Sequence, residues 1–358
     1  MTVFEHAEFD SHESVQYFSD DASGLRTIVA IHSTAMGPAA GGCRWWQYVN
    51  EDAAITDALR LSRGMTYKNA IAGLPFGGGK AVILAQQGQQ KPHELFKAFG
   101  QCVESLHGQY VTAADMGVTI ENMRIVQKYT SYVSGLKQQN NADSGDPAPW
   151  TAYGVFLGIK SAVEKKLGSD KIKGLRVAVQ GVGNVGYQLC KLLHTAGAIL
   201  TVSDINTTKI ARIRQELSAT IVNPEEILSK DVDVLSPCAL GGILNSRTIA
   251  DIKATIIAGC ANNQLEAEQD GYELAKRGIL YAPDYVINAG GIISVAREYL
   301  GNSSEDQLSK EIRRIPERLS ELFSIADCTD RPTHVIADEM ARSIVANAAK
   351  TEIIPLEP

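Results

Sequence analysis

The chain has 358 residues, a length that suggests about two domains at roughly 150 residues each. Hydrophobic residues make up 44% and charged residues 21%, which is typical of a globular chain with a sizeable core. Lys and Arg number 34 against 41 Asp and Glu, and this net charge of −7 argues against a general nucleic-acid binder, which needs a basic face. No apolar stretch reaches the ~18 residues of a membrane span, and the acidic start lacks the pattern of a signal peptide.

The cysteines and histidines indicate neither a disulfide framework nor a metal site. The six cysteines are scattered and form no CxxC pair, so we expect reduced thiols in a cytoplasmic protein. The seven histidines form no HxxxH or HExxH motif. The sequence therefore predicts no metal.

The first third of the chain mixes short apolar runs with amphipathic segments and glycine clusters. A glycine-rich stretch, GPAAGGCR, lies between the first expected strand and the first expected helix. The pattern predicts a strand over 26–32, a helix over 51–65, a strand after the glycines of LPFGGGKAVIL, a helix over 92–108, and a strand and loop over 110–116.

A polar stretch at 137–150, rich in Gly and Pro, is the best linker candidate. Beyond it, helices and strands alternate, which favours a parallel, doubly wound sheet and an α/β fold. Two long helices over 305–326 and 335–350 are expected to close the chain. The alternating elements are helices over 151–166, 184–196 and 207–217, strands over 176–180 and 199–203, and short apolar runs at 219–222, 232–235, 255–258 and 279–281.

The segment RVAVQGVGNVGYQLC predicts a dinucleotide-binding turn. Gly181, Gly183 and Gly186 follow an apolar strand in GxGxxG spacing and open an amphipathic helix, with Asn184 and Val185 between the last two. A second strand ends at Asp204, 23 residues after Gly181 (204 − 181), where an acid is expected to bind the ribose hydroxyls and repel a 2′-phosphate. These features favour NAD over NADP. The alternative is a βα turn with incidental glycines.

A second cluster lies in the first half of the chain. Lys68 stands in RGMTYK, Lys80 follows three glycines in PFGGGK, and Asp115 stands in TAADMG. Two lysines crowded into one enclosed site favour a neutral amine, which acts as a general base. A carboxylate can then exchange protons with an amine. Solvated surface lysines and a Schiff-base role for Lys80 are the alternatives, whereas a phosphate-binding P-loop is not satisfied.

With these motifs the chain resembles the amino-acid dehydrogenases of the Glu/Leu/Phe/Val dehydrogenase superfamily, in particular its leucine and phenylalanine dehydrogenase branch. The resemblance extends over roughly residues 26–300. It rests on sequence blocks that follow one another in the same order as in that superfamily: GPAAGGCR, DALRLSRGMTYKNA, FGGGKAVI, TAADMG, PAPWTAYGV, VAVQGVGNVG, SPCALGGILN, IIAGCANNQLE and YAPDYVINAGG.

The resemblance implies a reversible, NAD-dependent oxidative deamination of an L-amino acid to its 2-oxo acid and ammonia. It implies an N-terminal α/β substrate domain and a Rossmann-type domain, with the active site in the cleft between them. We expect the substrate domain at 1–135, rejoined by C-terminal helices of about 330–358, and the NAD-binding domain at 136–329. A homo-oligomer is also implied, with no membrane or nucleic-acid partner.

The resemblance also implies a role for particular residues. Lys68 would bind the substrate carboxylate, Lys80 would activate the attacking water, and Asp115 would move protons at the amino group. Further implied contacts are Gly41 and Gly42 at the substrate carboxylate, Asn262 at the nicotinamide ribose and the substrate, Asn288 at the nicotinamide, and Cys238 and Ala239 near the cofactor.

The expected substrate has an apolar side chain. Glutamate-type relatives place a Lys just before the paired glycines, and this chain has Ala40 there. The resemblance implies a pocket lined by Ala40, Met65, Ala113, Ile292 and Val295. Leucine, valine and isoleucine are favoured, and phenylalanine or tryptophan with an enlarged pocket is the alternative. A catalytically inactive NAD-sensing protein is the alternative of another class.

Overall fold

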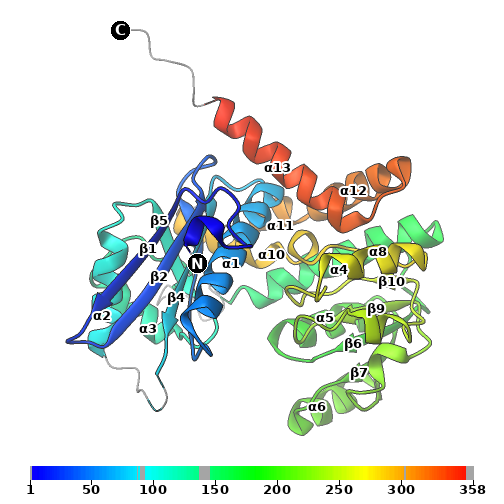
Figure 1. Cartoon of the computed structure of the whole chain (residues 1–358). Coiled ribbons are helices and arrows are strands. Elements are labelled where there is room, and N and C mark those ends of the chain that lie inside the picture. The colour runs from blue at the N-terminus through cyan, green and yellow to red at the C-terminus, as the bar shows by residue number, and fades with distance from the viewer. Residues whose placement is uncertain (1, 87, 89–92, 137–145, 302–303, 352–358) are drawn as a thin grey trace. The chain divides into compact units, whose positions relative to one another are not determined.

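The computed structural model describes residues 2–86, 88, 93–136, 146–301 and 304–351. The chain divides into two compact units (Figure 1). The first is Met1–Gly145 with Val295–Asn302 and Ala341–Pro358, and the second is Asp146–Ser294 with Ser303–Met340. The division at 135 and 330 expected from the sequence, and the role given to each part, stay predictions. Among the described residues no helix is long and apolar enough to cross a membrane.

The first unit contains a mixed sheet in the order β1-β2-β4-β3-β5. Strands β1, β2 and β4 pair antiparallel, whereas β3 pairs parallel with both β4 and β5. The sequence pattern predicted β2, β4 and β5 but not β1 or β3, and β3 begins with the small residues AAGG, which have low strand propensity. The strands are β1 (Ser14–Asp20), β2 (Leu25–Ser33), β3 (Ala39–Trp46), β4 (Gly77–Leu84) and β5 (Tyr110–Ala114).

Helices cover both faces of this sheet (Figure 1). Val82 of β4 shares a core with Leu59 of α1 (Glu51–Ala72), while its neighbour Ala81 shares a core with Phe96 of α2 (His93–Glu104). Side chains alternate along a strand, so the residues in step with Val82 face α1. A Cβ on Gly78 would lie 2.0 Å from the backbone N of Thr66, so only glycine lets α1 approach this closely.

Helix α1 is longer than the predicted 51–65, because buried residues continue along it up to Ala72. Its N-cap is Asn50, whose side chain accepts a hydrogen bond from the Ala53 N–H at 2.8 Å. It ends at Gly73, which has the left-handed conformation that favours glycine (φ 66°). The N-terminal segment also contains the helix α3 (Ile120–Gln127) and a short helical turn at Val3–Glu5.

The second unit contains a parallel sheet in the order β11-β10-β9-β6-β7-β8, which confirms the predicted doubly wound architecture. The chain leaves β6 toward β7 on one side and returns to β9 on the other. Nucleotides bind at such a switch point, beyond the carboxyl ends of the strands. The strands are β6 (Arg176–Gln180), β7 (Ile199–Ser203), β8 (Thr220–Ile221), β9 (Val234–Pro237), β10 (Ile256–Ile257) and β11 (Leu280–Tyr281).

The helices predicted over 151–166, 184–196, 207–217 and 335–350 are present, whereas α7, α8, α9 and α10 were not predicted from the sequence. The predicted helix over 305–326 is wrong, because the segment forms two helices that break after Ile312. Pro316 has no N–H, and its ring would collide with the Ile312 carbonyl in a continuous helix. The helices are α4 (Ala148–Leu167), α5 (Asn184–Thr195), α6 (Thr207–Leu217), α7 (Ser246–Ile249), α8 (Glu268–Lys276), α9 (Asp284–Ile287), α10 (Gly290–Tyr299), α11 (Glu305–Ile312), α12 (Ile315–Thr329) and α13 (Thr333–Thr351), with a short turn at Ile227–Ser229.

Most of the predicted linker lies outside the described residues. Positions 137–145 of the 137–150 stretch belong to that part, and α4 begins at Ala148. Pro149 stands in the first turn of α4, where its missing N–H costs no hydrogen bond.

Candidate active site

The structure brings together two of the predicted catalytic residues, Lys80 and Asp115. The Lys80 Nζ donates a hydrogen bond to Asp115 Oδ2 at 2.5 Å, and the lysine side chain is only 6% exposed. The sheet register explains the meeting, because Cys43 of β3 pairs with Ala81 on one side and with Ala114 on the other. Lys80 therefore lies level with the end of β5, which Asp115 directly follows.

Asp115 also accepts a hydrogen bond from Arg44 Nε at 3.2 Å. Burial by itself raises the pKa of Asp115, but Lys80 and then Arg44 more than offset this, and the pKa stays below its ordinary value. The carboxylate is thus held charged between two cations. Its own side chain is 30% exposed, so it can be reached by a small molecule.

Arg44 extends this contact into a network that the sequence did not predict. Its Nη1 donates to Asp57 Oδ2 at 2.8 Å, and the Tyr48 hydroxyl donates to the same oxygen at 2.6 Å. Asp57 lies on α1 and Arg44 on β3, so the network ties the helix to the strand. Arg44 lies two residues beyond Gly42 on the same strand face. In the sequence, the only signal for Arg44 was its place in the GGCR block.

The third predicted catalytic residue, Lys68, lies half-buried on α1, three residues after Met65 on one helix face. A Cβ on Gly41 would lie 3.3 Å from Met65 Cγ and 1.7 Å from the Gly79 carbonyl oxygen. The Gly41 carbonyl accepts a 2.7 Å hydrogen bond from the Tyr110 hydroxyl. Packing of the protein against itself therefore already requires this glycine, and its role toward a substrate carboxylate stays a prediction.

The predicted pocket residues are half-buried where the structure places them. Ala40 and Gly42 lie on the same face of β3, and Ala113 of β5 pairs with Gly42. Ile292 and Val295 lie three residues apart on α10, the former counted with the second unit and the latter with the first.

Each of the three glycines in the predicted dinucleotide turn meets a different requirement. Gly181 has a φ of +90°, and a Cβ there would lie 2.7 Å from the Ala239 Cβ. Gly186 sits in the first turn of α5, where a Cβ would lie 2.1 Å from the Gly181 carbonyl oxygen. A Cβ on Gly183 would have no neighbour within 4 Å among the described residues, so this backbone is open to an approaching group. This division is the one a bound pyrophosphate requires.

The start of α5 is also left open. Its N-cap residue is Gly183, which supplies no side-chain cap, so Asn184 and Val185 begin a helix with free N–H groups. Asp204 supports the turn from the end of β7: its Oδ2 accepts from the Val182 N–H and its Oδ1 from the Asn206 N–H, both at 2.8 Å. These residues fit a dinucleotide.

The two predicted asparagines contact each other. The Asn288 Nδ2 donates to Asn262 Oδ1 at 2.8 Å and to the Cys260 carbonyl at 3.1 Å. Asn288 is 3% exposed, and its Oδ1 has no hydrogen-bond partner among the described residues. Asn262 is exposed, so the buried asparagine holds the exposed one in place. The exposed Ala239 follows Cys238 at the end of β9.

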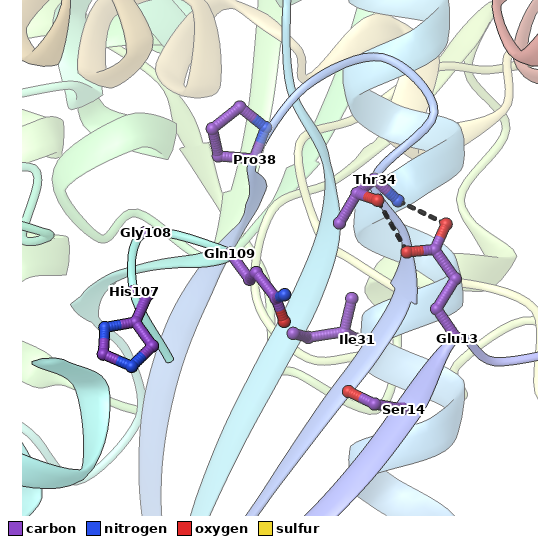
Figure 2. Close-up of a pocket in the computed structure, with 8 residues that line it drawn as sticks. All are labelled: Glu13, Ser14, Ile31, Thr34, Pro38, His107, Gly108 and Gln109. Atoms are coloured by element: carbon purple, nitrogen blue, oxygen red, sulfur yellow. Dashed lines mark hydrogen bonds between the residues drawn. The ribbon is translucent and has the colours of Figure 1, made fainter. Parts of the chain in front are cut away.

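A surface hollow in the first unit lies away from Asp115 (Figure 2). It opens where β3 and β5 begin, whereas Asp115 follows the end of β5. Glu13 on its wall is already engaged, since it accepts hydrogen bonds from the Thr34 N–H at 2.7 Å and hydroxyl at 2.6 Å. We therefore do not assign the chemistry to this hollow.

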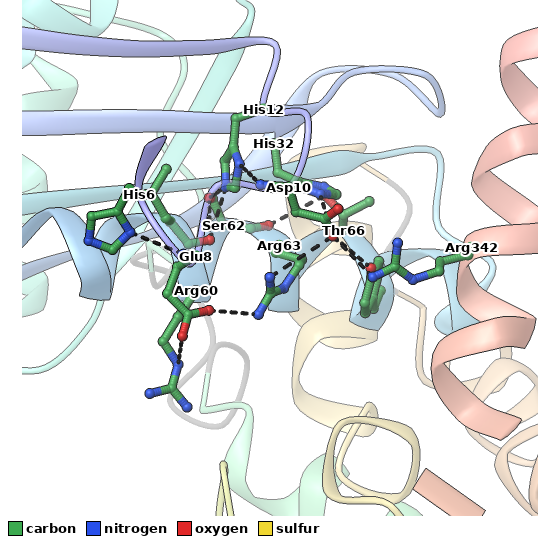
Figure 3. A network of polar contacts seen from close by, with 12 residues as sticks. His6, Glu8, Asp10, His12, His32, Arg60, Ser62, Arg63, Thr66 and Arg342 are labelled. Carbon is green, nitrogen blue, oxygen red and sulfur yellow. Dashed lines mark hydrogen bonds and ion pairs between the residues drawn. The ribbon is translucent and has the colours of Figure 1, made fainter. Parts of the chain in front are cut away.

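A histidine pair anchors the helix that carries Lys68 (Figure 3). The rings of His12 and His32 meet edge to face with centroids 4.8 Å apart. His12 Nδ1 accepts from the Asp10 N–H, so its Nε2 donates to the Leu59 carbonyl of α1 at 3.0 Å. Burial, and then repulsion from His12, lower the pKa of His32 to about 4, although Asp10 opposes the shift.

We expect this pair to make the fold sensitive to acid. The unfolded chain binds the His32 proton near pH 6.5 and the folded chain only near 4, so stability is full above 6.5 and falls as the pH drops toward 4. The loss attributable to His32 reaches at most about 3 kcal/mol. Urea unfolding of His32→Gln at several pH values should show a flatter dependence than the natural chain. The exposed His93→Gln is the control, and an equal slope in all three proteins would contradict the expectation.

The comparisons with known proteins agree over almost the whole chain. A family model described as "Glu/Leu/Phe/Val dehydrogenase, dimerisation domain" matches residues 11–132, and "Glutamate/Leucine/Phenylalanine/Valine dehydrogenase" matches residues 145–353. Leucine dehydrogenase of Geobacillus stearothermophilus is 47% identical over 98% of this chain and 95% of its own length. Phenylalanine dehydrogenase of Lysinibacillus sphaericus is 44% identical over 89% and 85%. The crystal structure of L-tryptophan dehydrogenase from Nostoc punctiforme, 46% identical, superposes with a TM-score of 0.84 over 95% of this chain and 97% of that one.

The fold and the site thus define a two-domain dehydrogenase that uses a pyridine nucleotide. The chain belongs to the Glu/Leu/Phe/Val dehydrogenase family, and it is an amino-acid dehydrogenase.

Proposed function

We propose that the chain catalyses the reversible, NAD-dependent oxidative deamination of an apolar L-amino acid to its 2-oxo acid and ammonia. The observation that carries this proposal is the buried contact between Lys80 and Asp115, a proton-transferring pair in an amino-acid dehydrogenase. A carboxylate that shares a hydrogen bond with a neighbouring lysine can exchange protons with it, and through it with water and an amine.

The reaction balances as amino acid, NAD⁺ and water giving 2-oxo acid, ammonia, NADH and a proton. Bound NAD supplies the acceptor for the hydride that leaves the substrate Cα. Lys68 holds the substrate carboxylate. Lys80 passes its proton to Asp115, with which it shares a hydrogen bond, and then takes a proton from the water that attacks the resulting imine. Asp115 then delivers a proton to the departing amino group. The low exposure of Lys80 supports its role, because few competing waters reach it.

We propose NAD rather than NADP on the charge at the end of β7. Both Asp204 oxygens accept backbone hydrogen bonds from the residues around the turn, which fixes the carboxylate beside the open backbone of Gly183. A 2′-phosphate brought near this carboxylate would be repelled. Asn262 and Asn288 would hold the nicotinamide end of the cofactor, with Cys238 and Ala239 near it.

The substrate side chain is proposed to be apolar. Ala40 of β3 offers no cation for a second carboxylate, and the proposed lining of Met65, Ala113, Ile292 and Val295 is apolar. Leucine, valine and isoleucine are favoured, since leucine dehydrogenases are among the relatives. The small side chain at Ala40 and the likeness to a tryptophan dehydrogenase support phenylalanine or tryptophan as the second candidate.

A substrate panel tests the proposal. With NAD⁺ at alkaline pH, NADH formation from leucine, valine and isoleucine should exceed that from phenylalanine and tryptophan, and glutamate should be at least about tenfold poorer, because it leaves a carboxylate without a partner. NADP⁺ should be poorer than NAD⁺. Glutamate as best substrate would refute the Ala40 argument, and faster turnover with NADP⁺ would refute the role of Asp204.

We further propose a homo-oligomer in the cytoplasm. Strand β1 is an edge strand, with Tyr17 48% exposed, in the segment matched by a dimerisation-domain model. All six cysteines are free thiols, as expected in a reducing compartment. The partners proposed are small molecules, with neither nucleic acid nor membrane.

A further inference from the structure

Two cysteines lie side by side at the carboxyl edge of the parallel sheet. Strands β9 and β10 pair in register up to Leu235 and Ile257, and each cysteine comes three residues later (238 − 235 and 260 − 257). Neighbouring strands are spaced by about 4.8 Å, which falls within the roughly 4.4–6.8 Å that a disulfide spans between Cα atoms. Both Cys238 and Cys260 are partly exposed.

The two thiols interact, and this sets Cys238 apart from the buried cysteines. Hydrogen bonding from Cys260 outweighs burial and, with the Ser236 hydroxyl at 3.5 Å, lowers the pKa of Cys238 below its ordinary value. Burial instead raises the pKa of Cys43 and Cys190. A thiol with a lowered pKa, in a partly exposed residue and beside a second cysteine, is typical of redox-active pairs.

The pair adjoins the residues proposed to bind the cofactor. A Cβ on Gly181 would touch Ala239, the residue after Cys238, and a Cβ on Gly186 would lie 3.3 Å from the Cys238 Cβ. On the other strand, the Cys260 carbonyl accepts a hydrogen bond from Asn288. A disulfide that fixes the two side chains therefore changes the packing against Gly181 and Gly186 on one strand and the backbone that holds Asn288 on the other.

We propose that Cys238 and Cys260 form a thiol pair that hydroperoxides oxidise reversibly to a disulfide, and that the disulfide weakens binding of the pyridine nucleotide. The Cys238 thiolate attacks one oxygen of the hydroperoxide, an S–O bond forms as the O–O bond breaks, and the departing oxygen takes a proton from solvent and leaves as an alcohol, or as water in the case of hydrogen peroxide. The Cys260 thiol then attacks the sulfenic sulfur, the S–S bond forms, and water leaves. A dithiol reductant restores both thiols. The effect on binding rests on the proposed function.

Hydrogen peroxide treatment of the whole protein tests the pair. Intact mass after thiol alkylation should show two fewer alkylated cysteines, and peptide mapping should find a link between 238 and 260. NADH titration by fluorescence should show a Kd raised about tenfold or more, restored by dithiothreitol. Saturating NADH should slow formation of the link.

Two variants distinguish an effect of the disulfide on NADH binding from a general loss of the fold. Cys260→Ser should form no link and keep its NADH affinity after peroxide, while Cys328→Ser, which removes an exposed cysteine on α12, should behave like the natural chain. Peroxide that converts Cys238 to a sulfinate without a link, or an equal loss of NADH affinity in Cys260→Ser, would overturn the inference. A link in a protein that binds no NADH when reduced would support the thiol pair and refute the proposed function instead.

Discussion

Replacing Lys80 with alanine is expected to lower the turnover of amino-acid oxidation by about 10²–10⁴-fold, the usual contribution of a positioned general base. The buried amine is lost from the site, and Asp115 keeps only Arg44 as a cationic partner. Steady-state rates with the best substrate of the panel measure the effect. NADH affinity should be unchanged, because the dinucleotide turn belongs to the second unit.

The matched control is Lys97→Ala, which removes a partly exposed lysine of the same unit that pairs with Glu94 at 3.1 Å. Its turnover should stay close to that of the natural chain. A Lys80→Ala protein that keeps full turnover would remove Lys80 from the mechanism. A joint loss of NADH affinity and circular dichroism signal would instead indicate a folding defect.

Asp115→Asn is expected to impair both turnover and stability. The amide keeps the shape of the side chain but leaves Lys80 and Arg44 without the carboxylate they share. Breaking a fully buried ion pair on one side costs about 3–5 kcal/mol, and the partial exposure of Asp115 places the expected loss near the lower end. Urea unfolding at neutral pH and initial rates measure the two effects.

Asp170→Asn is the control for charge alone, because Asp170 pairs with Lys160 at 2.8 Å on the surface. Little change in stability is expected there. If Asp115→Asn unfolds at the same urea concentration as the natural chain, the carboxylate is not balancing buried cations. If it also turns over at the natural rate, Asp115 has no part in proton transfer.

Local signals sufficed to predict the first part of the second unit, from α4 to α6, but not the helices α7 to α10. The strands over 176–180 and 199–203 and the helix over 207–217 were predicted with the bounds the structure has, because apolar runs and turn glycines mark their ends. The break before Pro316 was missed, although the proline itself marked it.

The first unit was harder to predict from sequence. Strand β3 is built from small residues whose strand state comes from pairing with β4 and β5, not from propensity. Lys80 and Asp115 were found through their motifs, and sheet register explains why they meet. The motifs did not reveal the network of Arg44, Asp57 and Tyr48. Its contacts join β3, the following loop and α1, and no short sequence pattern predicts contacts between these three elements.

The contact between Asp10 and Arg342 has a consequence for biosynthesis. Arg342 Nη2 lies 3.1 Å from Asp10 Oδ2 across 332 positions of the chain, and both residues belong to the first unit. At about 5–20 residues per second, the ribosome needs roughly 17–66 s between these two residues. The first unit therefore lacks this contact until almost the whole chain has been made, and the second unit is complete only slightly earlier, because it includes Ser303–Met340. The unit that emerges first is the one that is completed last.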